Sequence, residues 1–337
     1  TALYATNLPM LVQGAMFFGG VSTVLFLIGR PFDAFSTFVI EELFDFNEQT
    51  PRLFIRDTLI SLATGGLIAG ILGVAILWVI ESFPRYWAIG GAAIFLGFMV
   101  VFQVIYPRVI APLFNDFESI DSGDVRDAVD DVFGKAGFEC EEVYEVDASR
   151  RSTKTNAYFV GFGRSKRVVL YDTLLERMNL EEVKAVLAHE LAHWQKNHVW
   201  KLIAASVIQV GIVLAIAQYL MASGWLSEMF VFPPGATYGR LFLALLWIHP
   251  VMQFSAPIQN KLSLHHEREA DDFGASVVGV DPMVSSLQTL GGENLANPFP
   301  HPLYELFNYD HPPIPQRIRR LEEKRGEELQ GKITGPD

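Results

Sequence analysis

Two histidines and a glutamate near the middle of the chain have a spacing that suits a metal ion. They lie in the segment His189-Glu190-Leu191-Ala192-His193. Histidines four residues apart differ by about 40° around a helix, so both imidazoles face one ion, and Glu190 can reach a metal-bound water. This HExxH pattern is typical of zinc hydrolases. It predicts His189 and His193 as ligands of one Zn2+ per chain and Glu190 as the general base.

A later acidic cluster can complete the metal site. It reads His265-His266-Glu267-Arg268-Glu269-Ala270-Asp271-Asp272. Glu267 and Asp271 are four residues apart and share a helix face, so one can bind the ion while the other hydrogen-bonds a ligand histidine. Spacing alone does not choose between Glu267 and Glu269, and His265 or His266 are also formally possible ligands.

The elements that must position these residues can be read from the same region. Asn179, followed three residues later by Glu182, predicts a capping box at the start of the HExxH helix. We expect this helix to run through His198, Val199 and Trp200 into the apolar stretch that follows. On such a helix His198 lies about 140° around from His193, so we do not expect it to be a fourth ligand.

A hairpin is predicted before that helix. The segment Asn156-Ala157-Tyr158 fits its exposed edge, Arg167 to Tyr171 its other strand, and Gly163 to Lys166 its turn. An edge strand can bind an extended peptide by adding a strand to the sheet. We therefore expect Asn156, Ala157 and Tyr158 to bind substrate.

The composition indicates a membrane protein. Half of the 337 residues are hydrophobic and 19% are charged, against about 25% charged residues in soluble domains. Five stretches lack Lys, Arg, Asp and Glu and are long enough to span a bilayer. They are Leu8 to Gly29, Thr58 to Ile80, Tyr86 to Tyr106, Leu202 to Ser227 and Leu241 to Asn260.

The order of these stretches predicts how the chain is organised. Residues 1–106 hold spans and a loop at 30–57, 107–198 the first half of a catalytic domain, 199–262 a transmembrane hairpin, and 263–337 the second half. Because the hairpin returns to the side it left, both polar halves can form one domain. On this topology 24 of the 26 Lys and Arg residues lie on the side of the domain, so the positive-inside rule places it in the cytoplasm. The membrane is then a bacterial inner membrane, or the endoplasmic reticulum if the source is eukaryotic.

Several other classes of protein are excluded or left open. The net charge of −12 argues against a nucleic-acid partner, which normally leaves a basic patch. A single cysteine, Cys140, excludes an internal disulfide and a cysteine-based zinc finger. The oligomeric state cannot be read from the sequence.

Further segments resemble the type I CAAX prenyl protease family, integral-membrane zinc endopeptidases. The similarity covers nearly the whole chain. The segments that carry it are Thr37-Phe38-Val39-Ile40-Glu41-Glu42, Ile105-Tyr106-Pro107, Ala111-Pro112-Leu113-Phe114-Asn115, Ser149-Arg150-Arg151-Ser152, Asn156-Ala157-Tyr158-Phe159 and Arg167 to Leu175.

The resemblance implies a role for each matching residue. His189, His193 and Glu267 correspond to zinc ligands, Glu190 to the general base, and Asp271 to an acidic residue that supports a ligand or donates a proton. His311 corresponds to a histidine that stabilises the oxyanion, with Arg317 as its companion. The implied substrates are CAAX-type prenylated peptides or other membrane-associated peptides that reach the site from the lipid bilayer.

The implied fold is mainly α: a polytopic helical transmembrane barrel around a chamber, joined to a gluzincin-like α+β zinc protease domain with a small β-hairpin. The family has seven spans, so the first two would be absent here, and the chain begins with Thr1. Ala192 stands where the family usually has Gly, and Ser263-Leu264-His265-His266 replaces its basic segment. The short linker before His189 favours a prokaryotic source.

Two alternatives remain open. An HtpX-like quality-control membrane protease shares HExxH and a later glutamate, but would not predict the Asn-Ala-Tyr hairpin. A non-catalytic membrane scaffold with a relic site is the alternative from another class. The intact set of candidate residues argues against the relic.

Overall fold

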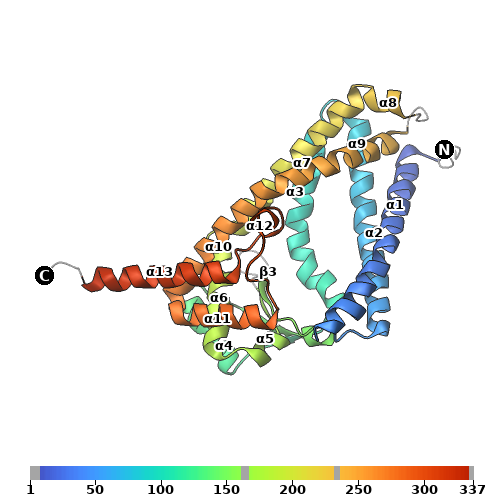
Figure 1. Ribbon diagram of the computed structural model, residues 1–337. Coiled ribbons are helices and arrows are strands. Elements are labelled where there is room, and N and C mark those ends of the chain that lie inside the picture. Colours follow the sequence, from blue (N-terminus) through green and yellow to red (C-terminus); the bar gives the residue numbers. More distant parts are fainter. Residues whose placement is uncertain (1–7, 161–166, 231–235, 334–337) are drawn as a thin grey trace. The chain divides into compact units, whose positions relative to one another are not determined.

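The computed structural model describes residues 8–160, 167–230 and 236–333 (Figure 1). The chain forms two compact units. The first comprises Thr1–Phe114 and Leu202–Phe254, and the second comprises Asn115–Lys201 and Ser255–Asp337. The chain passes from one unit to the other after Phe114, Lys201 and Phe254.

The first unit consists of helices. Thr50 caps α2 by accepting a hydrogen bond from the Leu53 amide at 3.2 Å, and Pro51 occupies the first helical turn, where its missing N–H costs nothing. The start of α7, up to Lys201, belongs to the second unit. The helices are α1 (Met10–Phe35), α2 (Pro51–Ser82), α3 (Trp87–Ile105), α7 (His198–Ala222), α8 (Trp225–Met229) and α9 (Thr237–Met252), with short π or 3-10 turns at Ser36–Glu41, Tyr106–Ile110, Ala111–Leu113 and Gln253–Ser255.

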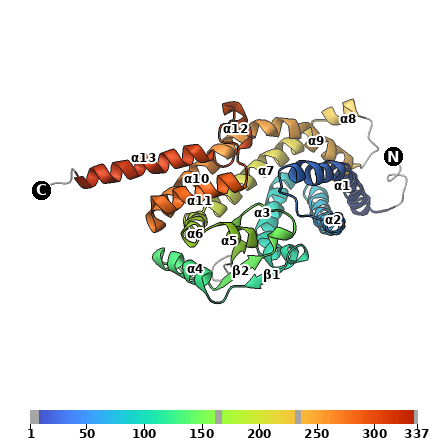
Figure 2. The same cartoon turned by 60° about the horizontal axis from the view of Figure 1, so that its bottom comes forward.

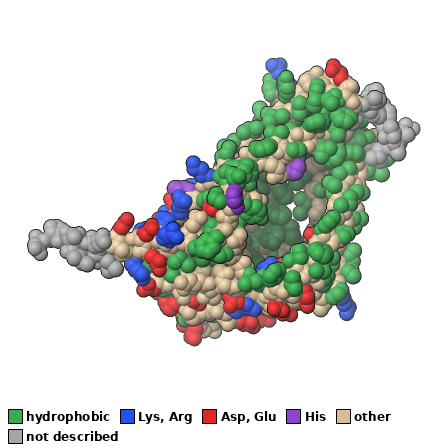
Figure 3. All heavy atoms as spheres, in the orientation of Figure 1, with side chains coloured by type: hydrophobic (Ala, Val, Ile, Leu, Met, Phe, Trp, Pro, Cys, Tyr) green, Lys and Arg blue, Asp and Glu red, His purple; other side chains and the backbone are tan. Residues whose placement is uncertain are grey.

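Five helical segments among the described residues are long and apolar enough to cross a membrane, as predicted. In the most apolar window of each, only 11–17% of the residues are buried inside the protein. Hydrophobic side chains therefore cover the outward faces of these helices (Figure 3), and the surroundings that they require are lipid. The segments are Met10–Glu41, Pro51–Ser82, Trp87–Leu113, His198–Ala222 and Thr237–Val278.

Close packing in the first unit is visible between α1 and α2. A Cβ atom at Gly14 would lie 2.1 Å from Leu77 Cδ1, so only glycine permits this approach. Nearby, the Tyr238 hydroxyl of α9 donates a hydrogen bond to Gln13 Oε1 at 3.3 Å. The buried polar groups of α1 and α9 thus satisfy each other, as groups removed from water must.

The second unit contains a small mixed sheet (Figure 2). The described strands are β1 (Phe117–Ser119), β2 (Glu142–Val146), β3 (Ala157–Val160) and β4 (Arg167–Tyr171), in the order β1-β2-β4-β3. Strands β2 and β4 are parallel, and the other pairs are antiparallel. The expected edge strand is β3, which pairs with β4 in the register Ala157↔Leu170. The predicted turn at Gly163 to Lys166 lies outside the described residues.

Helices surround this sheet and form the core of the second unit. The core includes the fully buried Leu170 of β4, Leu174 of α5 and Leu187 of α6. A Cβ at Gly274 of α10 would lie 2.7 Å from Met283 Sδ, so glycine leaves room there for the Met283 side chain of α11. The helices are α4 (Asp124–Lys135), α5 (Asp172–Arg177), α6 (Leu180–Gln195), α10 (Ala256–Val278), α11 (Val280–Glu293), α12 (Pro302–Asn308) and α13 (Ile314–Ile333), with a 3-10 turn at Ala148–Arg150.

Candidate metal centre

Helix α6 begins with the predicted capping box. The Asn179 side chain accepts hydrogen bonds from the amides of Glu181 and Glu182 at 3.1 Å, and the Asn179 amide donates to the Glu182 carboxylate. Glu182 also accepts a hydrogen bond from Thr289 Oγ1 of α11 at 2.9 Å. The capping box therefore fixes the start of the HExxH helix and ties it to α11.

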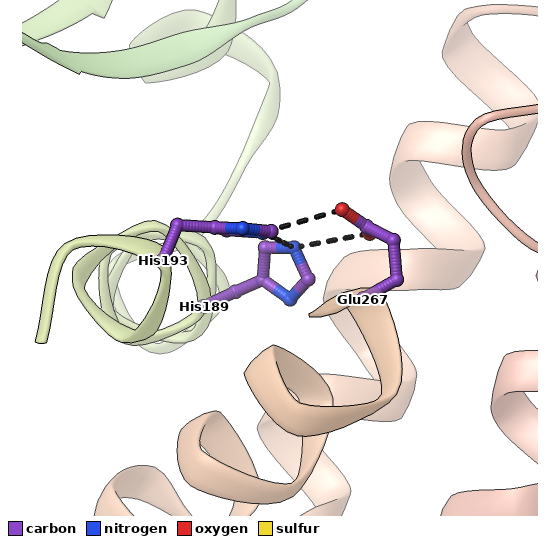
Figure 4. A group of neighbouring side chains, drawn as sticks. All are labelled: His189, His193 and Glu267. Carbon is purple, nitrogen blue, oxygen red and sulfur yellow. Dashed lines mark hydrogen bonds and ion pairs between the residues drawn. The ribbon is translucent and has the colours of Figure 1, made fainter. Parts of the chain in front are cut away.

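Three side chains from two helices bring their ligand atoms together (Figure 4). His189 and His193 project from α6 toward Glu267 of α10. Nε2 of His189 lies 3.3 Å from Nε2 of His193 and 3.4 Å from Glu267 Oε2, and Nε2 of His193 lies 3.2 Å from Glu267 Oε1. Tetrahedral ligands of Zn2+, at about 2.0–2.1 Å from the ion, are about 3.3 Å from one another. The three groups fit one ion of that size.

The burial of Glu267 supports the same fit. The residue is 2% exposed, and among the described residues its Oε2 has no donor in good hydrogen-bond geometry, since the contacts from His189 Nε2 and Arg317 Nη1 are long, at 3.4 and 3.8 Å. A buried carboxylate oxygen without a donor is costly unless a cation pairs with it. The structure also separates Glu267 from the alternatives left open by spacing. Glu269 contacts His198, His265 is exposed, and His266 stacks on the ring of His198 outside the group of ligand atoms.

Asp271 and Arg317 support the ligand His189. Asp271 Oδ1 lies 3.0 Å from His189 Nδ1, on the side of the ring that faces away from the ligand atoms. Arg317 of α13 binds the same carboxylate with two nitrogens, with Nε at 3.0 Å from Oδ2. Asp271 is 1% exposed. Its contacts are those of a residue that orients a metal ligand.

The charges around His189 shift its pKa. Burial lowers the value, but hydrogen bonds to the Asp271 and Glu267 carboxylates outweigh burial and raise the pKa of His189 to about 9. In the metal-free protein at neutral pH the imidazole is therefore protonated. A divalent cation would replace that proton between the same groups.

His311 reaches the ligand group from the loop before α13. Its Nε2 lies 3.3 Å from Glu267 Oε1, and its Nδ1 lies 2.9 Å from Asp310 Oδ1. The Asp310 hydrogen bond raises the pKa of His311, burial opposes it, and the Glu267 charge adds to the increase. The ring is 57% exposed, so His311 joins the buried ligand group to the solvent-accessible surface.

A cavity of about 240 Å³ in the second unit lies against these groups. Glu190 and His189 lie in its wall, together with Asn156 and Ala157 of the strand region. Its apolar lining comes from Leu174, Met283, Leu287, Leu290 and Ile314. Glu190, His189 and an edge strand therefore share one pocket with an apolar wall.

At Ala157 the backbone N–H and C=O of the edge strand take no part in the pairing with β4. The Asn156 carbonyl accepts from the Tyr171 amide at 3.1 Å, so in an antiparallel ladder the next residue, Ala157, turns its own N–H and C=O away from β4. The Ala157 amide donates to its neighbour's side chain, Asn156 Oδ1, at 2.9 Å. Tyr158 packs edge-on against Tyr171 and does not line the cavity, so its contact with substrate stays a prediction.

The sequence analysis missed one residue at this site, Asn294, and misplaced another, His198. The Asn294 side chain, at the end of α11, accepts a hydrogen bond from the Thr155 amide at 3.2 Å and anchors the start of β3. His198 lies 3.1 Å from His193 because α6 ends at Gln195 and Asn197 has a left-handed φ of 58°. The continuous helix expected through His198 is therefore wrong, and no signal for Asn294 was present in the sequence.

Matches to known proteins agree with this geometry. A profile of peptidase family M48 matches residues 119–325, and one described as CAAX prenyl protease N-terminal, five membrane helices, matches residues 3–116. The Arabidopsis thaliana CAAX prenyl protease 1 homolog is 34% identical over 313 residues, covering 91% of this chain and 72% of that protein. The Saccharomyces cerevisiae CAAX prenyl protease 1 is 30% identical, with 92% and 72% covered.

A solved structure is similar over the same extent. The crystal structure of S. mikatae Ste24p matches with a TM-score of 0.83 at 30% identity, covering 92% of this chain and 75% of that one. The fold and the donor set define an integral, multi-pass membrane metalloendopeptidase. The chain belongs to peptidase family M48. The predicted fold class, membrane location and enzyme class are confirmed, and the HtpX-like and scaffold alternatives gain no support.

Proposed function

We propose that the chain binds one zinc ion through His189, His193 and Glu267 and hydrolyses peptide bonds of CAAX-type or other membrane-associated peptides. The observation that carries the proposal is the set of three ligand atoms 3.2–3.4 Å apart, one of which belongs to His189 in the wall of the pocket that Glu190 and Ala157 also line. When bound, zinc would supply a Lewis acid that lowers the pKa of water and polarises a carbonyl.

The protein's own residues supply proton transfer and charge stabilisation. Glu190, in the cavity wall, is the base that accepts a proton from the attacking water and can return it to the leaving amine. His311, whose ring is 57% exposed, donates a hydrogen bond to the oxygen that gains negative charge. Arg317 acts through Asp271, which holds the ring of His189 in place.

Substrate binding is proposed at the edge of β3. An extended peptide would pair with the outward N–H and C=O of Ala157, and the Ala157 amide would exchange its bond to Asn156 for one to the peptide. Hydrogen bonds to main-chain atoms give little selectivity for the substrate's sequence. The apolar cavity wall suits an aliphatic or aromatic side chain of the substrate. This combination favours short, apolar peptides such as CAAX termini.

The substrate proposal is tested with a matched pair of peptides, one farnesylated at its CAAX cysteine and one not. Zinc-loaded protein in detergent should cleave the farnesylated peptide with the higher kcat/KM. Glu190→Gln should cleave neither, while Glu181→Gln, an exposed change on the same helix, should behave as wild type. Equal cleavage of both peptides by wild type would remove the requirement for a prenyl group.

We further propose that the catalytic unit faces the cytoplasm, because 24 of the 26 Lys and Arg residues fall on its side of the predicted topology. A fluorescent protein fused after Asp337 should fluoresce in a bacterial host, whereas a periplasm-dependent phosphatase at the same position should be inactive. A dark fluorescent protein together with an active phosphatase would contradict a cytoplasmic catalytic unit.

A further inference from the structure

The ligand histidine His193 has a partner that the HExxH pattern does not include. Its Nδ1 lies 3.1 Å from Nδ1 of His198, the first residue of α7. Its Nε2 is on the opposite side of the ring, 3.2 Å from Glu267 Oε1. Both nitrogens of His193 are therefore in contact with another side chain.

Metal binding leaves one arrangement of hydrogens for this contact. A ligating Nε2 presents its lone pair to the ion, so the neutral ring of His193 carries its hydrogen on Nδ1. That hydrogen is donated to Nδ1 of His198, which must then carry its own hydrogen on Nε2. Nε2 of His198 lies 3.0 Å from Glu269 Oε2, which accepts it. The chain of hydrogen bonds ends on a carboxylate, as the bond from His189 to Asp271 does.

The ring of His198 is held in a fixed orientation. The residue is fully buried, and its ring stacks on that of His266 with centroids 4.1 Å apart and planes 10° from parallel. An imidazole packed in this way cannot turn its Nδ1 away from His193 without losing the stack and the bond to Glu269.

The backbone between the two helices creates this contact. Asn197 has a φ of 58°, in the left-handed region that asparagine tolerates better than most residues. This residue separates α6 from α7 and places His198 beside His193, where a continuous helix would direct it about 140° away.

We propose that His198 and Glu269 form a hydrogen-bonded pair that positions His193 for metal binding, as Asp271 positions His189. The inference rests on the proposed zinc site. His198 is a positioning residue, since it contacts a ligand through the nitrogen that does not face the metal.

The test measures metal binding by the full chain in detergent. Zinc is titrated into metal-free protein against a chromogenic chelator, and visible absorption of the Co2+-loaded protein reports the ligand field. His198→Phe, which removes the acceptor and keeps the ring, should weaken zinc binding about 10- to 100-fold and change the Co2+ spectrum. His198→Asn, whose Oδ1 can replace Nδ1 as acceptor, should restore part of the affinity.

Two further variants separate positioning from general damage. Glu269→Gln keeps an acceptor oxygen but loses the charge, so a smaller loss of about 3- to 10-fold is expected. Lys261→Gln changes an exposed residue of the same helix and should bind zinc as wild type does. Circular dichroism verifies that each variant folds. If His198→Phe does not fold, the zinc affinity of Glu269→Gln alone tests the positioning role.

The outcomes distinguish failure of the proposed zinc site from failure of the positioning role of His198 and Glu269. Wild type that binds no zinc would contradict the proposed function. Wild type that binds zinc, with His198→Phe or Glu269→Gln binding it equally well, would contradict the positioning role only.

Discussion

Asp271 Oδ1 lies 3.0 Å from His189 Nδ1, and the carboxylate that orients this ligand is itself held by Arg317. The histidine is thus fixed by a buried ion pair on the side opposite the metal-binding nitrogen. This relationship links α6, α10 and α13, three helices far apart in the sequence, at one ligand.

Loss of the Asp271 charge should weaken metal binding. Asp271→Asn keeps an oxygen for His189 but leaves Arg317 buried without its counter-charge. We expect zinc affinity to fall about 10- to 100-fold, and the free energy of unfolding to fall by about 3–5 kcal/mol. Chelator competition and chemical unfolding measure the two effects.

The neighbouring residue provides the control. Asp272 pairs with Arg320 and Lys324 and is 31% exposed, so Asp272→Asn should leave zinc affinity unchanged. Equal affinities for Asp271→Asn and wild type would contradict the role assigned to Asp271.

Zinc affinity should depend on pH through His189. Its pKa is raised from 6.5 to about 9 in the metal-free protein, so below pH 9 an incoming ion must displace a proton. Apparent zinc affinity should therefore increase from pH 6.5 to 9, with proton release visible by calorimetry in two buffers of different ionisation enthalpy. An affinity that is flat across this range would show that His189 is not protonated.

The same shift predicts the stability of the metal-free protein. Because the folded pKa lies above the unfolded value, the protonated ring stabilises the fold fully below pH 6.5, and this stabilisation is lost as the pH rises to 9. Thermal unfolding of metal-free protein should show a lower Tm at pH 8.5 than at pH 6.5. In His189→Gln this part of the decrease should be absent.

The alkaline limit of activity should follow His311. The Asp310 hydrogen bond raises the pKa of His311, so Asp310→Asn should lower that pKa and move the alkaline limb of kcat/KM to lower pH. His311→Ala should lower kcat about 100- to 1,000-fold, as the loss of an oxyanion donor does. An alkaline limb unchanged in Asp310→Asn would argue that another group sets it.

Asn197 should be replaceable by glycine but not by a β-branched residue. Asn197→Gly keeps the left-handed conformation, and Asn197→Val should cost about 1–2 kcal/mol because a β-branched side chain fits a positive φ less well than asparagine does. If the break between α6 and α7 positions His198, Asn197→Val should also weaken zinc binding while Asn197→Gly does not. Identical zinc affinities for the two variants would contradict the claim that the break between α6 and α7 supports zinc binding.

Local patterns predicted a large part of this structure. The absence of charge marks the membrane spans, the Asn179 capping box marks the start of α6, and the four-residue spacing of His189 and His193 places both on one face. The third ligand required tertiary information, because Glu267 and Glu269 are equivalent by spacing and differ only in which face of α10 meets α6.

The remaining features depend on single backbone angles or distant packing. One left-handed residue, Asn197, places His198 beside His193, and a prediction from helical periodicity assumes an unbroken helix. Asn294 reaches Thr155 only because α11 packs beside the start of β3, and the cavity wall combines α5, α6, α11 and α13. Such contacts arise from the assembled fold and leave no local pattern.

The central claim is that His189, His193 and Glu267 bind the metal while Glu190 performs the proton transfer. The most direct measurement compares zinc content and peptide cleavage in wild type, Glu190→Gln and Glu267→Gln. The account predicts about one zinc per chain in wild type and Glu190→Gln, much less in Glu267→Gln, and cleavage reduced at least about 100-fold in both variants. Full activity in Glu190→Gln, or wild-type zinc content in Glu267→Gln, would contradict it.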